Sequence, residues 1–118
     1  MSTREIQRDE WREFFDSFSK QHQGHLVTIE VLGMDVGDQV EARRLPLEGI
    51  TVEFGNGEEA QFEVIAGERP DSHISHTIAS PMRVWVKQTE EGADEVLEIE
   101  SESGTVFLLF RSEERQEN

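Results

Sequence analysis

The feature that most constrains this chain is a change in hydrophobic period at Gly24. Before Gly24, apolar side chains recur three or four residues apart and charged residues lie between them, which is typical of an amphipathic helix. Ser2 followed by Glu5 fits a capping box, and Gly24 supplies the left-handed residue that commonly ends a helix. The sequence therefore predicts one helix over about 4–22, whose apolar face is formed by Ile6, Trp11, Phe14, Phe15 and Phe18 and can extend to His22.

After Gly24 the period is two, and turn residues separate short runs rich in β-branched and aromatic residues. Pro46 and Gly49 predict a bend or bulge, and 55–57 reads as a hairpin tip. Because the connections are too short for crossover helices, the strands must be mainly antiparallel. The predicted strands are 26–32, 39–45, 49–54, 60–67, 72–78, 82–89, 95–102 and 105–111.

These elements predict an α+β fold: one N-terminal amphipathic helix packed on a mainly antiparallel small β-barrel or strongly bent sheet of about eight strands. The last strand is apolar on both faces over 106–110, so we expect both faces to be covered. One face would look into the barrel. The other would receive the helix through Trp11, Phe14, Phe15 and Phe18.

The length of 118 residues is that of a single domain, and 35% hydrophobic residues are enough for one core. We expect that domain to span 1–118, with the helix at about 4–22, the sheet at about 25–111 and a frayed tail at 112–118.

The charge balance argues against two kinds of partner. With 26 acidic and 11 basic side chains, the formal net charge of -15 would repel both nucleic acid and an anionic membrane surface. The two lysines among so many acids fit either a salt-adapted host or an ordinary acidic bacterial protein. The charged N-terminus has no apolar run, so neither a secretory signal nor a membrane span is predicted, and a cytoplasmic location is expected.

The four histidines form two H-x-x-H pairs, His22 with His25 and His73 with His76. Residues three apart on a strand face opposite ways, and Gly24 separates the members of the first pair, so no metal and no cofactor are expected. His76 should face inward as a hydrogen-bonded core histidine. His22 suits a position near a helix C-terminus, where a cation is favoured.

Glu98, Glu100 and Glu102 share one face of a predicted strand, which has two interpretations. They are either a cation or acid–base site, or the partners of an outward row on the preceding strand. We favour the second, in which a hairpin over 90–94 places inward Val84 and Val86 against Leu97 and Ile99, and outward Arg83, Trp85 and Lys87 against the glutamates.

Candidate binding residues are few. Trp85, flanked by Arg83 and Lys87, has two interpretations: it is an exposed aromatic with cationic neighbours, as binding surfaces often have, or it packs against glutamate side chains or under a loop. His76 is a candidate for contact with a ligand. The absence of cysteine removes thiolate nucleophiles and thiolate ligands, and no serine nucleophile motif occurs, so an enzyme is not expected.

Two functions remain open. The first is a non-enzymatic acidic interaction or accessory module that binds a protein or a small ligand. The alternative is a small-molecule-binding barrel with enzymatic chemistry near His76. A deep polar pocket holding His76 and a carboxylate would favour the alternative, and a filled barrel would favour the first. The sequence does not specify the ligand, the partner or the oligomeric state.

Three motifs carry a resemblance: W-x-x-F-F-x-x-F-S at 11–19, V-E-A-R at 40–43 and H-x-x-H-T at 73–77. The chain resembles, over nearly its whole length, a family of small bacterial proteins known only as a domain of unknown function. The resemblance implies one coherent domain. It transfers no catalytic residues.

Overall fold

The computed structural model describes residues 2–33, 37–55, 59–67 and 73–110. A short strand β1 (Ser2–Ile6) and one 3-10 turn (Arg8–Glu10) precede helix α1 (Trp11–His22). Seven strands follow: β2 (Leu26–Gly33), β3 (Gly37–Phe54), β4 (Ala60–Ala66), β5 (Ile74–Ala79), β6 (Pro81–Gln88), β7 (Asp94–Ser101) and β8 (Gly104–Leu109). Most of the predicted hairpin tip and the predicted tail 112–118 lie outside the described residues.

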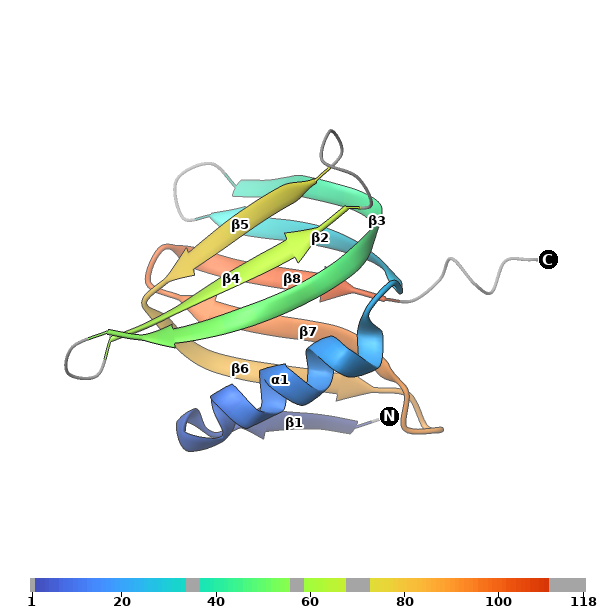
Figure 1. Ribbon diagram of the computed structural model, residues 1–118, viewed down its shortest axis with the longest axis horizontal. Coiled ribbons are helices and arrows are strands. Elements are labelled where there is room, and N and C mark those ends of the chain that lie inside the picture. The colour runs from blue at the N-terminus through green and yellow to red at the C-terminus, as the bar shows by residue number, and fades with distance from the viewer. Residues whose placement is uncertain (1, 34–36, 56–58, 68–72, 111–118) are drawn as a thin grey trace.

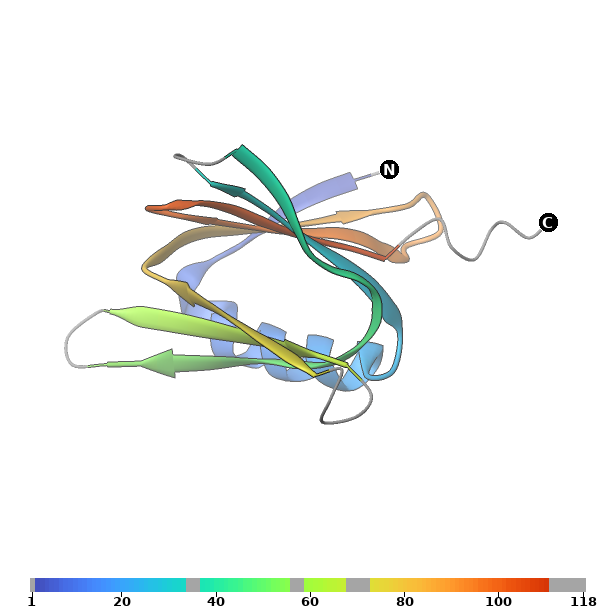
Figure 2. The same cartoon turned by 90° about the horizontal axis from the view of Figure 1, so that it is seen from above.

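The eight strands form one antiparallel sheet in the order β1-β6-β7-β8-β2-β3-β4-β5, which is strongly bent and not closed. The bend lies within the long strand β3, whose first part pairs with β2 and whose second part pairs with β4. Figure 2 shows the resulting two layers, with the second half of β3, β4, β5 and α1 on one side and the remaining strands on the other. The predicted α+β class with a bent sheet is confirmed.

The bend falls where Pro46 and Gly49 predict it. Pairing between β3 and β4 shifts register between Leu47 and Gly49, so the predicted bulge is confirmed. The predicted strands 39–45 and 49–54 are nevertheless one continuous strand, because the bulge turns the chain without ending its hydrogen bonding.

The predicted start of the helix is wrong. Residues 2–6 pair with β6 instead, from Ser2 opposite Gln88 to Ile6 opposite Val84. This pairing buries Ile6, and the indole Nε1–H of Trp11 donates to the carbonyl oxygen of Ile6 at 3.0 Å. If residues 4–6 were helical, they would lose both the strand pairing with β6 and the hydrogen bond from Trp11 to Ile6.

The capping residue also differs from the prediction. The backbone N–H of Gln7 donates to Oε1 of Glu10 at 3.2 Å, so the reciprocal cap lies five residues beyond Ser2. The predicted end of the helix is confirmed: α1 ends at His22, and Gly24 has a φ of 88°.

Helix α1 covers an open strand edge. After β3 leaves β2, one side of its backbone has no strand neighbour, and α1 runs alongside it (Figure 1). The backbone N–H of Ile50 donates to Oγ of Ser19 at 2.9 Å, and that hydroxyl donates to the carbonyl oxygen of Ile50 at 3.2 Å. Ser19 therefore satisfies backbone groups that another strand would otherwise satisfy.

The expectation that α1 packs on the outer face of the last strand is wrong. Phe18 contacts Phe110 with ring centroids 5.6 Å apart, and Phe110 continues the inward row of Val106 and Leu108. Because the bent sheet is concave, its inner side offers the helix more apolar contact than its outer side. The outward residues Phe107 and Leu109 are half-buried among their strand neighbours.

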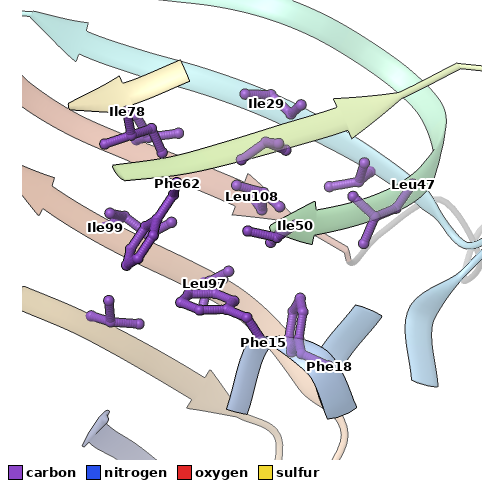
Figure 3. Packing of buried hydrophobic residues seen from close by; sticks show 14 of the residues in the cluster. Phe15, Phe18, Ile29, Leu47, Ile50, Phe62, Ile78, Leu97, Ile99 and Leu108 are labelled. Atoms are coloured by element: carbon purple, nitrogen blue, oxygen red, sulfur yellow. The ribbon is translucent and has the colours of Figure 1, made fainter. Parts of the chain in front are cut away.

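The interior of the bend is filled by side chains (Figure 3). Phe62 of β4 is fully buried and packs against Trp11 and Phe15, with ring centroids 5.1 and 4.8 Å apart. The remaining buried residues in the close-up come from strands of both layers, including Ile29, Leu47, Ile50, Ile78, Leu97, Ile99 and Leu108.

Strands β6 and β7 form the predicted hairpin. Val84 lies opposite Ile99 and Val86 opposite Leu97, as expected. On the outer face the prediction is confirmed only in part: Arg83 lies opposite Glu100 and Trp85 opposite Glu98, but Lys87 lies opposite Val96. Glu102 lies beyond the end of β7 because the turn to β8 begins there.

Candidate ligand-binding site

The C-terminal end of α1 brings a histidine and an aspartate together. His22 lies four residues after Phe18, so helical periodicity places it on the buried face of α1. Its Nε2 lies 2.7 Å from Oδ2 of Asp94, the first residue of β7. Both side chains are shielded from solvent, with 7% of the His22 side chain and 9% of the Asp94 side chain exposed.

Two aromatic rings hold the His22 imidazole in place. It stacks on Phe110 with centroids 4.6 Å apart and an interplanar angle of 29°, and its centroid lies 4.5 Å from that of Phe18. Rotation of the imidazole away from Asp94 would require these rings to move. The core therefore determines where the nitrogen atoms of His22 point.

His25 is the second histidine of the site and is positioned by its backbone. The turn through Gly24 is closed by a bond from the N–H of His25 to the carbonyl of His22 at 2.9 Å. The carbonyl of His25 accepts from the N–H of Leu47 at 2.9 Å. With its backbone fixed in this way, His25 directs Nδ1 toward Nδ1 of His22, 3.0 Å away.

Asp94 is held in its ionised form. The hydrogen bond from His22 lowers the pKa of Asp94 below its ordinary value, which outweighs the opposing effect of burial. The side-chain amide of Gln88 donates to Oδ1 at 2.7 Å, and the charge of Arg4, with that of His22 when it is protonated, acts in the same direction. Both carboxylate oxygens are thus engaged by donors of the protein.

An ionised Asp94 determines the hydrogen-bonding roles along the chain of side chains. Nε2 of His22 must carry a proton, because it faces a carboxylate oxygen at 2.7 Å. The two Nδ1 atoms share one proton, since two N–H groups would repel each other and two lone pairs would form no bond. The role of the outer nitrogen of His25, Nε2, then depends on the charge of the pair. It accepts a hydrogen bond when the pair is neutral and donates one when the pair is cationic.

These residues line a broadly open surface cavity of about 630 Å³. Its wall has an apolar part formed by Leu26, Ala93 and Phe110 and a polar part formed by Gln21, His22, His25, Arg44 and Asp94. The wall contains one acidic residue, which is already bonded, and it contains Arg44 and two histidines. In a chain of net charge -15, the cavity is a local region without free acidic groups.

A bulge places Arg44 in this wall. Between the pairs Val27 with Leu45 and Ile29 with Ala42, two residues of β3 lie opposite the single residue Thr28. Arg44 has a φ of 57°, a left-handed conformation unusual for a residue with a Cβ, and its backbone N–H donates to Oγ1 of Thr28 at 3.2 Å. The bulge thereby directs Arg44 toward the cavity.

The sequence-based candidates lie elsewhere. His76 is on the inward face, opposite Val64, but it is half-buried because β5 is an edge strand; its predicted facing is confirmed and its predicted burial is wrong. His73 is exposed, and its Nε2 lies 3.0 Å from Oε1 of Glu48. Arg83 is exposed and Trp85 half-buried on the outer face, so the fold does not bring them together with His76.

Sequence reasoning missed the association of His22, His25 and Asp94. The helical spacing from Phe18 to His22 was a usable signal for the first of them. No signal in the sequence connected Asp94 to the helix end. Within the residues that the structure describes, no group of three or more histidine, cysteine, aspartate or glutamate side chains is arranged to hold a metal ion.

The fold and the cavity define a small α+β protein whose polar pocket lies at the end of its only described helix. The model of a family of unknown function (DUF5335) matches residues 2–118, and the chain belongs to that family. An uncharacterised protein of Aquifex aeolicus (strain VF5) is 30% identical over 109 residues, which cover 92% of this chain and 91% of the relative. No solved structure matches. Among the described residues, no helix has the length and apolar character needed to cross a membrane.

Proposed function

We propose that this protein is a non-enzymatic binding module, and that its ligand site is the cavity at the C-terminal end of α1. One observation carries the proposal: the hydrogen-bonded series Asp94, His22 and His25 ends at an exposed imidazole on the wall of a cavity of about 630 Å³. Cavities of this size that combine an apolar wall with a few convergent polar groups are typical small-molecule sites.

The engagement of the polar groups supports binding rather than catalysis. Both oxygens of Asp94 and both ring nitrogens of His22 are bonded within the protein. The polar groups of the wall left to meet a ligand are those of His25, Arg44 and Gln21, which suits recognition. The filled interior of the bend also favours an interaction module over a barrel with an internal reaction chamber.

A second candidate is proton-transfer chemistry, now placed at His25 rather than at His76. The observation that favours it is the connection of His25 to the carboxylate of Asp94 through His22. A carboxylate that holds a histidine in one tautomer and orientation is an arrangement found in general-base catalysis. His25 would then act as the general base toward a ligand in the cavity.

The site can be tested by nitrogen-edited NMR with a library of small fragments. We expect shift changes centred on His25, Ala93 and Phe110. The competing location is the cleft beside Phe54, where Arg12 and Arg8 lie over the ring at 5.0 and 5.6 Å. Hits confined to that cleft would contradict the proposal.

A pair of variants sharpens the test. His25→Ala removes an exposed side chain of the site and is expected to weaken fragment binding. His73→Ala removes an exposed histidine that precedes β5 and does not line the cavity, and it is expected to leave binding unchanged. Equal loss in both variants would show that the effect is not local to the cavity.

We further propose a cytoplasmic location. We also propose that Arg83 and Trp85 contact a protein partner. The support for these two residues is that Arg83 is exposed on the outer face of the sheet and that the half-buried Trp85 lies beside it, between Glu5 and Glu98. A photo-crosslinking residue at position 83 would identify such a partner in a bacterial host that contains the native gene.

A further inference from the structure

We infer that the cavity at the end of α1 selects small carboxylate ligands, and that their binding is coupled to the uptake of one proton by the His22 and His25 pair. This inference rests on the proposed function and specifies the ligand class of the same site. It is carried by the charges of the cavity wall, by the geometry of the two histidines and by the backbone of Arg44.

The charges of the wall favour an anion. Asp94 is not free to bind a cation, since His22 and Gln88 engage its two oxygens at 2.7 Å each. Arg44 supplies a fixed positive charge in the cavity wall. A guanidinium binds a carboxylate in a bidentate, charge-assisted manner that neutral ligands do not allow.

The geometry of the histidine pair links binding to protonation. In the neutral pair, Nε2 of His25 is an acceptor and would repel a carboxylate oxygen. After uptake of one proton, the same atom is a donor and attracts it. The pair takes up one proton and not two while the contact of 3.0 Å between its Nδ1 atoms persists, because a second proton would place two N–H groups face to face.

The other charged groups near the pair do not reverse this preference. From β7, Asp94 faces His22 and favours a positive charge on it. From β1, Arg4 acts on Asp94 and partly offsets that effect, and from β3, Arg44 lines the cavity. On α1, Lys20 is exposed and pairs with Asp16 at 3.4 Å. A bound carboxylate would compensate the charges of Arg44 and of the protonated pair together.

The backbone of Arg44 is a further indication that its side chain has a role. Left-handed positions are usually occupied by glycine, and other residues adopt them at a cost in stability. Such outliers concentrate at functional sites. The Arg44 side chain is exposed, and its backbone conformation would suit glycine better, so ligand contact is the role that the cavity offers it.

The experiment compares three probes with one skeleton: benzoate, benzamide and benzylamine, which differ in charge and share a ring for the apolar wall. Binding is measured by NMR and by calorimetry in two buffers of different ionisation enthalpy. We expect benzoate to bind most tightly, its affinity to rise as the pH falls through the range in which imidazoles titrate, and its binding to take up at most one proton.

Two variants and one control test the residues involved. Arg44→Gly is expected to weaken benzoate binding at least about tenfold without lowering the melting temperature, since a charge-assisted pair is lost and a strained position is relieved. Arg43→Ala alters the neighbouring exposed arginine, which does not line the cavity, and is expected to leave binding unchanged. His25→Ala is expected to abolish the proton uptake.

Failure of the inference and failure of the proposed function have different signatures. Binding of benzamide or benzylamine in the cavity as tightly as benzoate, or benzoate binding without proton uptake, would overturn the inference and leave the site standing. If none of the probes shifts the signals of His25 and Phe110 at millimolar concentration, both are overturned. An undiminished affinity in Arg44→Gly would also contradict the inference.

Discussion

His22 and Asp94 are 72 positions apart in the chain, yet Nε2 of one lies 2.7 Å from Oδ2 of the other. The contact joins the end of α1 to the start of β7, and both side chains are almost fully buried. It thus fixes the last residue of α1, whereas Arg12 near the start of the helix donates to the carbonyl oxygen of Val52. The polar cluster is therefore structural as well as a candidate ligand site.

Replacing Asp94 by asparagine should destabilise the protein and flatten its response to acid. Because folding lowers the pKa of Asp94, its contribution is present above the ordinary value of 3.8 and is lost as the pH falls through the lower folded-state value. At neutral pH we expect Asp94→Asn to cost about 1–3 kcal/mol. Urea denaturation between acid and neutral pH measures both effects.

Asp16→Asn is the matched control for that experiment. The carboxylate of Asp16 is 68% exposed and pairs with Lys20 along the helix. Exposed pairs of this kind contribute about 0–1 kcal/mol, so the variant should retain the acid response of the natural protein. If both variants behave alike, the buried contact of Asp94 contributes no special stability.

Zinc or nickel at micromolar concentration should leave the melting temperature unchanged. The two Nδ1 atoms of His22 and His25 face each other, but zinc sites generally use three or four protein ligands and Asp94 is engaged by other donors. A metal that binds the folded state must stabilise it. A rise of several degrees at one metal ion per chain would show that the ligand set is larger than these residues.

Truncating Phe15 should be among the most damaging changes in the helix. Its side chain is fully buried and packs against Phe62 with centroids 4.8 Å apart. We expect Phe15→Ala to cost about 3–5 kcal/mol, and Phe14→Ala to cost clearly less because Phe14 is only partly buried. If thermal unfolding showed the same loss of stability for Phe15→Ala and Phe14→Ala, the assignment of Phe15 to the buried face of α1 would be contradicted.

Glycine at position 104 should be irreplaceable by alanine. A Cβ there would collide with the carbonyl oxygen of Leu32 and lie 3.0 Å from Cα of Gly33, and the φ of 150° is itself unfavourable for alanine. We expect Gly104→Ala to cost about 2–4 kcal/mol through strain and displaced backbone. Gly55→Ala, with open space around its Cβ, should change the urea midpoint little.

Added salt should stabilise the protein. A net charge of -15 on 118 residues implies self-repulsion in the folded state, and screening shortens its range from about 30 Å at 0.01 M salt to about 3 Å at 1 M. Exposed ion pairs such as Asp16 with Lys20 are weakened too, but each contributes too little to reverse the trend. A urea midpoint that falls as sodium chloride increases would mean that pairing dominates over repulsion.

The outer face of the sheet shows where pattern reasoning reaches its limit. The alternation along β6 and β7 correctly predicted that Val84 and Val86 oppose Ile99 and Leu97. It misplaced Lys87, because the register that pairs Trp85 with Glu98 continues without a break and puts Lys87 opposite Val96. The period of the side chains predicted which face they share, but it did not fix which residue of the glutamate row each outward residue meets.

The amino-acid sequence by itself determined the local elements: the amphipathic face of α1, its end at Gly24, the antiparallel strands and the bend beside Pro46. These follow from side-chain period and from turn residues, which act between neighbours in the chain. Only the tertiary structure decided that residues 2–6 join the sheet, that α1 covers the free edge of β3, and that Asp94 meets His22 and His25. Those contacts join segments that are far apart in the chain, and the bent sheet brings the segments together although no local sequence pattern connects them.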